Sequence, residues 1–306
     1  MHHQHPGRGN LHQVSGHRHN GGCGSRDACD DGSTLSVVNV PGTLPDGVTY
    51  DAVHHTFTLD PGNAAYQHLA EGATTTVTVS YSVSDGIVTT PTPASVSWTI
   101  TGTNDAPTID ASDFQTAQSG GTTTISNLSV ADPDASDTFT VTATADHGTV
   151  TFSPSSGDLA TVNGALGTGI AYTPTGTPAT DKVALTVTDA AGAHDTVNFI
   201  FNVSGTGPVT LQGTSDKDVF FATGYQDTFV FAPSSNQDVI TNGFQAGTDK
   251  IDLQAFSSIN ATALADILTN ADHTGGDTLL HLNGTTDTLL VKGVAALNAN
   301  DFILHA

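Results

Sequence analysis

The sequence is short of glutamate, of basic residues and of cysteine. Of its 306 residues, 30 are acidic and only 7 are basic, which gives a formal charge of −23, and every acidic residue except Glu71 is an aspartate. Helical surfaces use glutamate freely, whereas aspartate favours turns, helix caps and oxygen-ligand metal loops. The chain also contains 49 Thr and 32 Gly. This strand-and-turn composition argues against an α-helical enzyme.

Positively charged residues are scarce in the body of the chain. All three Arg lie within the first 26 residues, and from Asp27 onward 4 Lys stand against 30 acids, which gives 4 − 30 = −26. Such a surface repels nucleic acid and anionic membranes and attracts cations. We therefore expect no nucleic-acid partner.

Long apolar runs are missing as well. No stretch approaches the roughly 18 apolar residues of a membrane span, so we expect none. The first 30 residues also lack the apolar run of about 7–15 residues that marks a secretory signal. The two cysteines, Cys23 and Cys29, cannot form a disulfide framework.

Residues 1–26 hold six of the fourteen His and no Phe, Tyr or Trp. Because they show no periodic apolar pattern, we interpret them as a disordered leader, added by a misplaced start or a tag to a truncated domain. Four residues of this region offer zinc ligands in an alternative interpretation, although their spacing matches no common zinc module: His17, His19, Cys23 and Cys29.

An internal repeat follows the leader. Residues 81–86, Tyr-Ser-Val-Ser-Asp-Gly, return as Leu-Thr-Val-Thr-Asp-Ala at 185–190, and residues 96–103 return at 199–206. The offset of 103 to 104 residues is much longer than a solenoid repeat of about 20–50 residues, and it matches a whole β-sandwich domain of about 100 residues. The repeat therefore predicts two tandem domains, 27–107 and 108–208.

Apolar and polar residues alternate in the strand-like segments of both repeats. The pattern is clear in 76–83, 96–100, 139–144 and 183–187, each bounded by Gly, Pro, Asp or Asn. Alternation with a period of two indicates one buried and one wet face, as in two packed antiparallel sheets. We predict an all-β protein that begins with two Ig- or cadherin-like β-sandwiches.

The last third, 209–306, has a different pattern and predicts a β-rich third domain. An x-Asp-x-apolar step recurs at Asp218, Asp227 and Asp238, and seven of the thirteen Phe lie in this region, most of them as core. One short helix is expected at 261–270, and 287–304 predicts two closing strands.

Three resemblances cover these units. Residues 31–107 resemble a VCBS repeat, a tandem module of bacterial surface proteins, without its first strand; residues 108–205 resemble a cadherin-like or immunoglobulin-like module; and 209–306 resemble the C-terminal region of RTX-type proteins exported by type I secretion. The matching words are Leu44-Pro-Asp-Gly-Val-Thr49, Phe57-Thr-Leu-Asp-Pro61, Asn63–Gly72, Thr101-Gly-Thr-Asn-Asp-Ala-Pro107, Ala131-Asp-Pro-Asp134, Val187-Thr-Asp189, Asp227-Thr-Phe-Val-Phe231, Phe244–Leu253 and Asp301-Phe-Ile-Leu304.

Together these resemblances imply the C-terminal part of a large secreted or cell-surface adhesin. They imply the type I secretion machinery as a partner, with the export information at the C-terminus, and an unidentified surface or glycan target. The RTX nonapeptide has glycines that are missing here in every copy. We therefore expect at most a degenerate calcium turn or two, with Asp216 and Asp218 as candidate ligands.

The common catalytic motifs are missing. The chain has no H-E-x-x-H, no G-x-S-x-G and no G-x-x-x-x-G-K-[ST]. We therefore expect no enzyme and no catalytic residues.

Calcium is the cofactor that the sequence favours, because it takes six to eight oxygen ligands from carboxylates on flexible turns. Asp132, Asp134 and Asp137 offer three carboxylates within six residues. The cadherin-like resemblance places Asn104 and Asp105 opposite this cluster or Glu71. Asp85 and Asp189 follow equivalent strands and are further candidates. The alternative interpretation is that each Asp only closes an Asx turn.

We thus predict a calcium-stabilised structural and adhesive protein, secreted or held at the cell surface. Two alternatives remain open: a glycan-binding module and the non-catalytic tail of an exported hydrolase. Glycan binding favours exposed Trp and Tyr, and the chain has one Trp and five Tyr. Trp98 aligns with Phe201 in the repeat, which predicts a core position.

Overall fold

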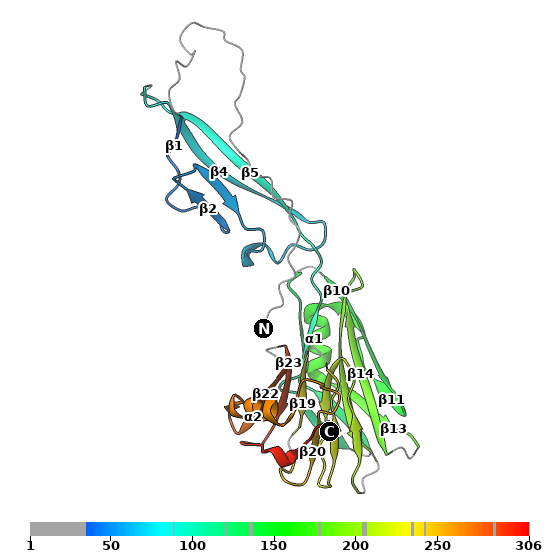
Figure 1. Cartoon of the computed structure of the whole chain (residues 1–306). Helices are drawn as coiled ribbons and strands as arrows, with labels where there is room; N and C mark the ends of the chain where they lie inside the picture. The colour runs from blue at the N-terminus through cyan, green and yellow to red at the C-terminus, as the bar shows by residue number, and fades with distance from the viewer. Residues whose placement is uncertain are drawn as a thin grey trace. The chain divides into compact units, whose positions relative to one another are not determined.

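The computed structural model is built almost entirely from β-strands, with only two short α-helices among the residues it describes. This confirms the predicted all-β fold class. The described chain divides into two compact units, one formed by 35–105 with 133–134 and the other by 106–132 with 137–305 (Figure 1). The structure describes residues 35–87, 89–119, 121–134, 137–176, 179–203, 207–233, 236–241, 243–283 and 286–305. The predicted leader, 1–26, lies outside these ranges, as does its alternative zinc site.

The first unit contains a three-stranded sheet of order β1-β4-β5 and a separate β2-β3 hairpin. Its long strands form because Val77 and Val79 alternate with threonine and serine, so that one face of β4 is buried and the other is exposed. The elements are β1 (Ser36–Val38), β2 (Val48–Asp51), β3 (Thr56–Leu59), the 3-10 turn η1 (Ala64–Tyr66), β4 (Thr74–Ser84) and β5 (Thr92–Thr101).

A small core holds the first unit together. Leu59 and Ile100 are buried there with Val77 and Val79, and Trp98 is partly buried against them, in agreement with the core position expected from the repeat. The tight turn before β2 requires glycine, because Gly47 has φ +71° and a Cβ there would lie 2.7 Å from the carbonyl oxygen of Asp60.

The second unit begins with a β-sandwich. A four-stranded sheet of order β11-β13-β8-β7 faces the strands β12-β10-β14-β15, and the short pair β6-β9 closes one end. The strands are β6 (Thr108–Asp110), β7 (Gln115–Ser119), β8 (Thr122–Ser126), β9 (Ser129–Ala131), β10 (Thr138–Ala145), β11 (Gly148–Thr151), β12 (Ser156–Asp158), β13 (Ile170–Pro174), β14 (Thr180–Thr188) and β15 (His194–Asn202).

The sequence prediction missed one helix, α1 (Leu159–Thr168), which lies inside this sandwich region. The Asp158 side chain caps it by accepting a hydrogen bond from the Thr161 N–H, and Val162 and Leu166 are fully buried in the sandwich core. Two glycines within ten residues weaken the local helix signal, so packing decides the outcome. The expected helix at 261–270 is confirmed as α2 (Ala261–Thr269).

The C-terminal region winds as a coil whose successive strands enter two parallel sheets in turn. β17, β19 and β23 pair in parallel on one side, and β16, β18, β20 and β24 pair in parallel on the other. The elements are β16 (Thr210–Gln212), β17 (Lys217–Phe220), β18 (Thr228–Val230), β19 (Gln237–Ile240), β20 (Lys250–Asp252), β21 (Asp272–Thr274), β22 (Asp277–Asn283), β23 (Asp287–Val291), the 3-10 turn η2 (Ala299–Asp301) and β24 (Phe302–Ile303).

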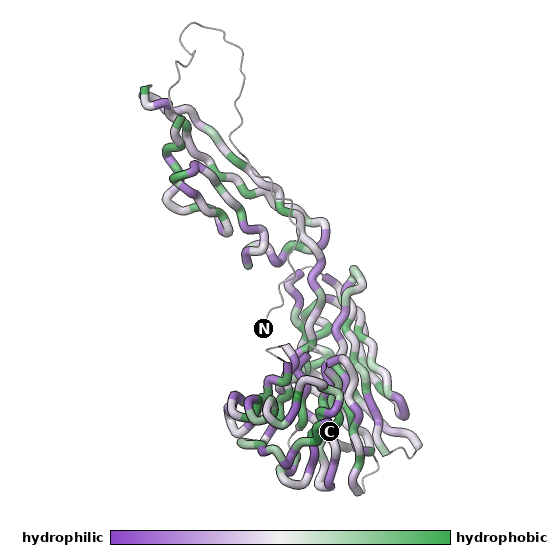
Figure 2. The backbone as a smooth tube through the Cα atoms, in the orientation of Figure 1, coloured by the Kyte–Doolittle hydropathy of each residue, from purple (hydrophilic) through white to green (hydrophobic). Residues whose placement is uncertain are grey.

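The coil and the sandwich share one sheet, because β17 pairs in parallel with β15 and extends it to nine strands. Figure 2 shows apolar and polar residues interspersed along the backbone. The shared sheet also carries a shared core: Phe201 stacks on Phe221 with ring centroids 4.2 Å apart, and Val219 and Val239 of the coil belong to the sandwich core. The predicted domain boundary at 208/209 stays a prediction.

Two of the four lysines hold the sandwich and the coil together. Lys217 Nζ donates to the carbonyl oxygen of Ile109 at 2.5 Å and lies 3.5 Å from Asp195 Oδ2, and Lys292 Nζ donates to the carbonyl oxygen of Ser112. Charged donors on carbonyl groups form strong hydrogen bonds. The few basic residues of the body are therefore used for internal contacts.

Because the sheet and core are shared, we predict that residues 106–305 unfold cooperatively. The change is Phe199→Ala, which removes a fully buried ring that packs near Phe114 and Phe221. It is expected to cost about 3–5 kcal/mol of unfolding free energy and to weaken the coil together with the sandwich. Hydrogen exchange at the amides of β18 and β20 measures this effect. Phe57→Ala, in the first unit, is the control, and unchanged protection of β18 and β20 in the Phe199 variant would contradict the prediction.

Candidate metal centre

Three carboxylates meet in the loop between β9 and β10. Asp132, Asp134 and Asp137 each place an oxygen within 4.8 Å of the others, and they form the only such group of three or more ligand residues among the described parts of the chain. Calcium binds oxygen at about 2.3–2.6 Å, so two oxygens on one ion lie at most about 5 Å apart. The spacing therefore fits a calcium ion. That these three Asp bind calcium stays a prediction.

The neighbours of the loop make it more acidic. Burial raises the pKa of Asp137, and the charge of Asp189 adds to the shift. Asp189, at the end of β14, is itself buried, and its Oδ1 accepts a hydrogen bond from the Ala193 N–H at 2.8 Å. A bound cation would reverse this penalty, because it favours the charged carboxylate.

The linker predicted to face the loop contributes a backbone group. The N–H of Asp105 donates to Asp134 Oδ2 at 2.9 Å, and the Asn104 side chain donates to the carbonyl oxygen of Asp105. Asp134 is 2% exposed. Asp105 thus orients a carboxylate of the cluster through its main chain.

The other predicted ligands lie elsewhere. Glu71 is exposed in the turn before β4, and Asp85 Oδ1 accepts from the Ile87 N–H at 2.9 Å in the turn after β4. Asp216 is exposed at the first turn of the coil, and Asp218 is buried beside it. The group of three carboxylates includes none of these four.

Asp218 belongs to a set of buried turn residues that the sequence analysis did not identify as a group. Each of them is at most 1% exposed, although an aspartate is rarely buried unless it is paired. All lie in the coil, at or beside the ends of its parallel strands. We call this set the aspartate ladder: Asp218, Asp227, Asp238, Asp249, Asp287 and Asp301.

Members of the ladder accept backbone N–H groups from their own turn. Asp218 Oδ2 accepts from the Thr214 N–H at 2.6 Å, and Asp249 Oδ2 accepts from the Gln245 N–H at 2.8 Å. Asp227 accepts in the same way from Thr223 at 3.2 Å. These three carboxylates therefore each close a tight turn between one strand of the coil and the next.

The ladder also connects successive turns of the coil. The N–H of Asp218 donates to Asp238 Oδ1 at 2.9 Å, and the N–H of Asp227 donates to Asp249 Oδ1 at 3.0 Å. The N–H of Gly247 donates to Asp301 Oδ1 at 2.5 Å. The recurring x-Asp-x-apolar step was the sequence signal for this arrangement.

Burial shifts the titration of the ladder upward. It raises the pKa of Asp218 to about 6 and that of Asp238 to about 8, and it also raises the pKa of Asp249. The charges of Asp218 and Asp287 add to the shift of Asp238, whereas the N–H of Asp218 and the charge of Lys217 oppose it. Burial therefore disfavours the ionised form of these carboxylates relative to that of exposed aspartates.

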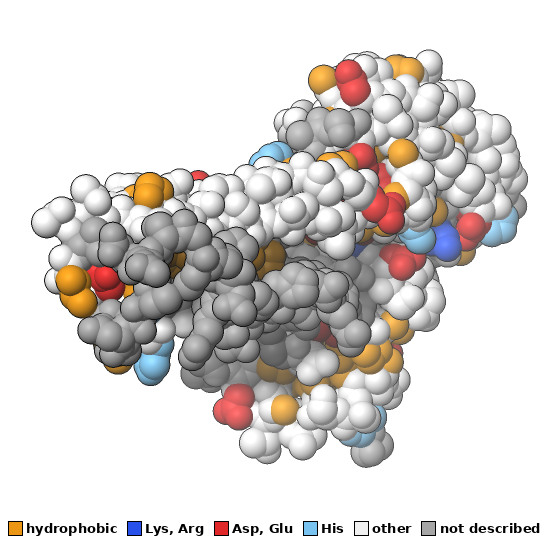
Figure 3. Space-filling model, turned by 90° about the horizontal axis from the view of Figure 1, so that it is seen from above, with side chains coloured by type: hydrophobic (Ala, Val, Ile, Leu, Met, Phe, Trp, Pro, Cys, Tyr) orange, Lys and Arg blue, Asp and Glu red, His pale blue; other side chains and the backbone are white. Residues whose placement is uncertain are grey.

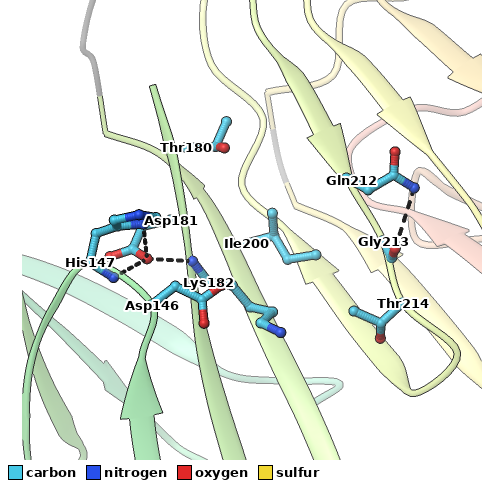
Figure 4. Close-up of a pocket in the computed structure, with 9 residues that line it drawn as sticks. All are labelled: Asp146, His147, Thr180, Asp181, Lys182, Ile200, Gln212, Gly213 and Thr214. Carbon is cyan, nitrogen blue, oxygen red and sulfur yellow. Dashed lines mark hydrogen bonds and ion pairs between the residues drawn. The ribbon is translucent and has the colours of Figure 1, made fainter. Parts of the chain in front are cut away.

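A pocket of about 300 Å³ lies where the sandwich meets the coil (Figure 4). Its most buried acid, Asp181, accepts hydrogen bonds from Tyr172 Oη at 2.5 Å, from the His147 N–H at 2.8 Å and from the Lys182 N–H at 2.9 Å. Burial raises the pKa of Tyr172, and its hydrogen bond to Asp181 and the charge of that carboxylate add to the shift. The hydrogen bonds of Asp181 hold the turn before β11 against β14, and Asp181 thus has a structural role there.

The surface carries the acidic character of the sequence. On the face that Figure 3 shows, red carboxylates are spread over a mostly uncharged surface, and blue basic side chains are scarce. Within the described chain, no helix has the length and apolar composition needed to cross a membrane.

Part of the chain matches a known protein family. Residues 104–202 match the family described as Bacterial Ig domain, and this range includes the described strands of the β-sandwich, β6 to β15. Domains of this family are typical of extracellular or surface proteins, have structural or adhesive roles and are typically non-catalytic. A comparison with curated proteins gives no match.

Among solved structures, the chain is similar to the crystal structure of Drosophila N-cadherin EC1-4. The identity is 13% and the TM-score 0.22, over 55% of this chain. The match spans 41% of the N-cadherin chain.

The raised pKa of Asp238 predicts that the coil loses stability as the pH rises. Its ordinary pKa is 3.8 and its folded-state pKa is about 8, so the folded state holds a proton that the unfolded state releases. The stabilisation is complete below about pH 4 and is lost as the pH rises towards about 8. The midpoints of urea-induced unfolding at pH 5 and pH 8 measure this loss of stability.

Asp238→Asn keeps an oxygen that can accept the Asp218 N–H but cannot ionise. Its midpoint is expected to fall less between the two pH values than that of the unmodified chain. The exposed Asp216→Asn removes the same charge and serves as the control. If both variants fall as steeply as the unmodified chain, Asp238 does not carry the proton.

Proposed function

We propose that the chain is a structural and adhesive part of a large secreted bacterial surface protein. The observation that carries the proposal is the bacterial Ig domain at 104–202, whose two sheets enclose one continuous core. A packed sandwich that matches a typically non-catalytic family suits a stalk or an adhesive module better than an enzyme. The resemblance of 31–107 to a VCBS repeat supports the same role, because such modules occur in tandem.

Calcium is the proposed stabilising cofactor, and the loop 132–137 is its proposed site. Three carboxylates with Asp189 near them supply enough oxygen for an ion that takes six to eight ligands, together with water and main-chain groups. The ion would offset the mutual repulsion of these acids. Extracellular modules bind calcium at about 10⁻⁴–10⁻³ M, so the site would fill outside the cell. Asp216 and Asp218 would serve as a second site only if Asp218 gave up its hydrogen bond from Thr214.

Export through a type I secretion apparatus is the proposed route. The support is the resemblance of 209–306 to the C-terminal region of RTX-type proteins, together with a coil of parallel strands in the same region. The alternative of a glycan-binding module lacks an aromatic platform at Trp98, which packs against the core of the first unit. The alternative of a hydrolase tail keeps the same export route and differs only in the chain to which these domains are attached.

The calcium proposal predicts a higher melting temperature of the full chain in calcium than in chelator. At a calcium concentration of about ten times the dissociation constant, binding adds about 1.4 kcal/mol, which corresponds to a few degrees. Asp134→Asn with Asp137→Asn is expected to abolish the increase. The control pair, Asp46→Asn with Asp266→Asn, removes two exposed charges and keeps it. An equal increase in both double variants would place calcium elsewhere.

The export proposal predicts that the full chain leaves a bacterial cell only when a type I secretion apparatus is present. The chain is produced in two strains that differ only in that apparatus, and its amount in the medium is measured by immunoblot. A cytoplasmic protein produced in the same cells controls for lysis. A chain that stays inside both strains, or leaves both equally, would contradict this route.

A further inference from the structure

The outer edge of β5 is the longest strand edge in the first unit. β5 has ten residues, pairs with β4 on one side and is the last strand of its sheet, so no strand in the described chain pairs with its other side. On the opposite side of that sheet, the three residues of β1 pair only with 82–84 of β4, and the eight residues 74–81 of β4 pair with no other described strand there. An edge as long as that of β5 exposes a row of backbone N–H and C=O groups that can bind another strand.

The usual protections of an edge strand are missing from β5. Proteins block such edges with charged side chains, proline or bulges. No charged residue occurs between Asp85 and Asp105, and the pairing of β5 with β4 runs without a register shift from Thr92 to Thr101. Pro93 protects only the start of the strand. Within the described chain, nothing therefore blocks the segment 94–101 from pairing with another strand.

The internal repeat contains a strand with the same position and a covered edge. β15 corresponds to β5 at an offset of 103 residues, and it also pairs with the strand before it. On its other edge β15 takes β17 in parallel, from Val197 opposite Lys217 to Ile200 opposite Phe220. The strand that follows β5, β6, pairs instead with β9. The equivalent edge thus carries a strand in one repeat and none from the described chain in the other.

We propose that the edge of β5 binds β5 of a second copy of this chain, as an antiparallel pair with a two-fold axis at Ser97. In this register Val96 lies opposite Trp98 and Ala94 opposite Ile100, so the core-facing residues of both copies continue on one face. A two-fold interface pairs the same surface of both copies, and β5 is self-complementary in this sense.

Charge favours a second copy at this strand. Each chain carries a formal charge of −23, so two copies repel each other wherever their carboxylates approach. β5 and β4 contain no charged residue, and they are joined by a turn with a single acid, Asp85. The pairing therefore brings two acidic molecules together along strands free of carboxylates. This association goes beyond the proposed adhesive role and needs no calcium.

A charge exchange on the solvent face tests the register. Ser95 and Thr99 are exposed, and in the proposed pair Ser95 of one copy lies opposite Thr99 of the other. Ser95→Lys with Thr99→Lys places like charges opposite each other and is expected to weaken the dimer about tenfold or more, as is Ser95→Glu with Thr99→Glu. Mixing the Lys chain with the Glu chain is expected to restore dimers, now of mixed composition. Sedimentation of the full chain in chelator measures the fraction of dimer in the Lys variant, in the Glu variant and in their mixture.

The matched control lies one strand inward. Thr76 and Ser80 of β4 are exposed on the same face and pair with Thr99 and Ser95. Thr76→Lys with Ser80→Lys adds the same charge away from the edge, and it is expected to weaken the dimer less than the edge variant does. A dimer that the edge variants leave intact would overturn the proposal, because association would then involve another surface.

The only tryptophan of the chain, Trp98, reports on the same edge. Its fluorescence is expected to become less accessible to acrylamide as the protein concentration rises through the dimer range. A chain that stays monomeric at all concentrations overturns the proposal. In that case a protected Trp98 would show that another segment of the same chain covers the edge, and an accessible Trp98 would show that the edge stays open.

Discussion

The second unit depends on β15, because both edges of this strand carry another strand. β14 pairs with it in antiparallel orientation and β17 in parallel orientation, so the sheet of the sandwich continues into the coil. Its residues 197–201 are buried on both faces: Phe199 and Phe201 enter the sandwich core, whereas Ile200 enters the core of the coil. The polar member of this run, Asn198, donates to Thr214 Oγ1 at 3.0 Å. A single strand thus joins the two cores. Without this pairing, β15 and β17 would each have an exposed strand edge.

Aspartate solves two different problems in this acidic chain. Inside the coil, buried carboxylates accept the backbone N–H groups of tight turns, which would otherwise lose their hydrogen bonds to water. The cost is desolvation of the carboxylate, and the raised pKa of Asp238 shows that protonation relieves part of it. In the loop 132–137, three carboxylates instead lie close to one another, and burial together with the charge of Asp189 raises the pKa of Asp137. Protonation would lower the desolvation cost of the buried carboxylates in the coil, whereas a bound cation would lower the repulsion among the carboxylates of the loop.

The sequence predicts those elements whose signal is local. Alternation in 76–83 and 183–187 indicates strands that the structure contains as β4 and β14, and the apolar face of Leu264 and Ile267 indicates α2. Helix α1 has a weak signal, because Gly164 and Gly167 interrupt it, and its stability depends largely on the burial of Val162 and Leu166. The three carboxylates at 132–137 were found because they are close in sequence. The x-Asp-x-apolar step indicated a regular spacing of Asp in the coil. The burial of the aspartate ladder was nevertheless missed, because the sequence does not distinguish a turn Asp whose carboxylate points inward from one whose carboxylate points outward.

The pairing of β15 with β17 also has no local signal, and comparison with β5 explains why. The two strands occupy equivalent positions in the repeat, yet the edge of β15 is covered and the edge of β5 pairs with no described strand. The difference comes from the chain that follows each strand. After β15, the coil returns β17 along the sheet, whereas after β5 the short strand β6 pairs with β9 of the next sandwich. The backbone N–H and C=O groups of a repeated strand therefore allow a further strand to pair with its edge. Which strand pairs there is determined by the sequence that follows the repeat. The uncharged edge of β5 retains this capacity to pair, and this is why an acidic chain can associate at that strand.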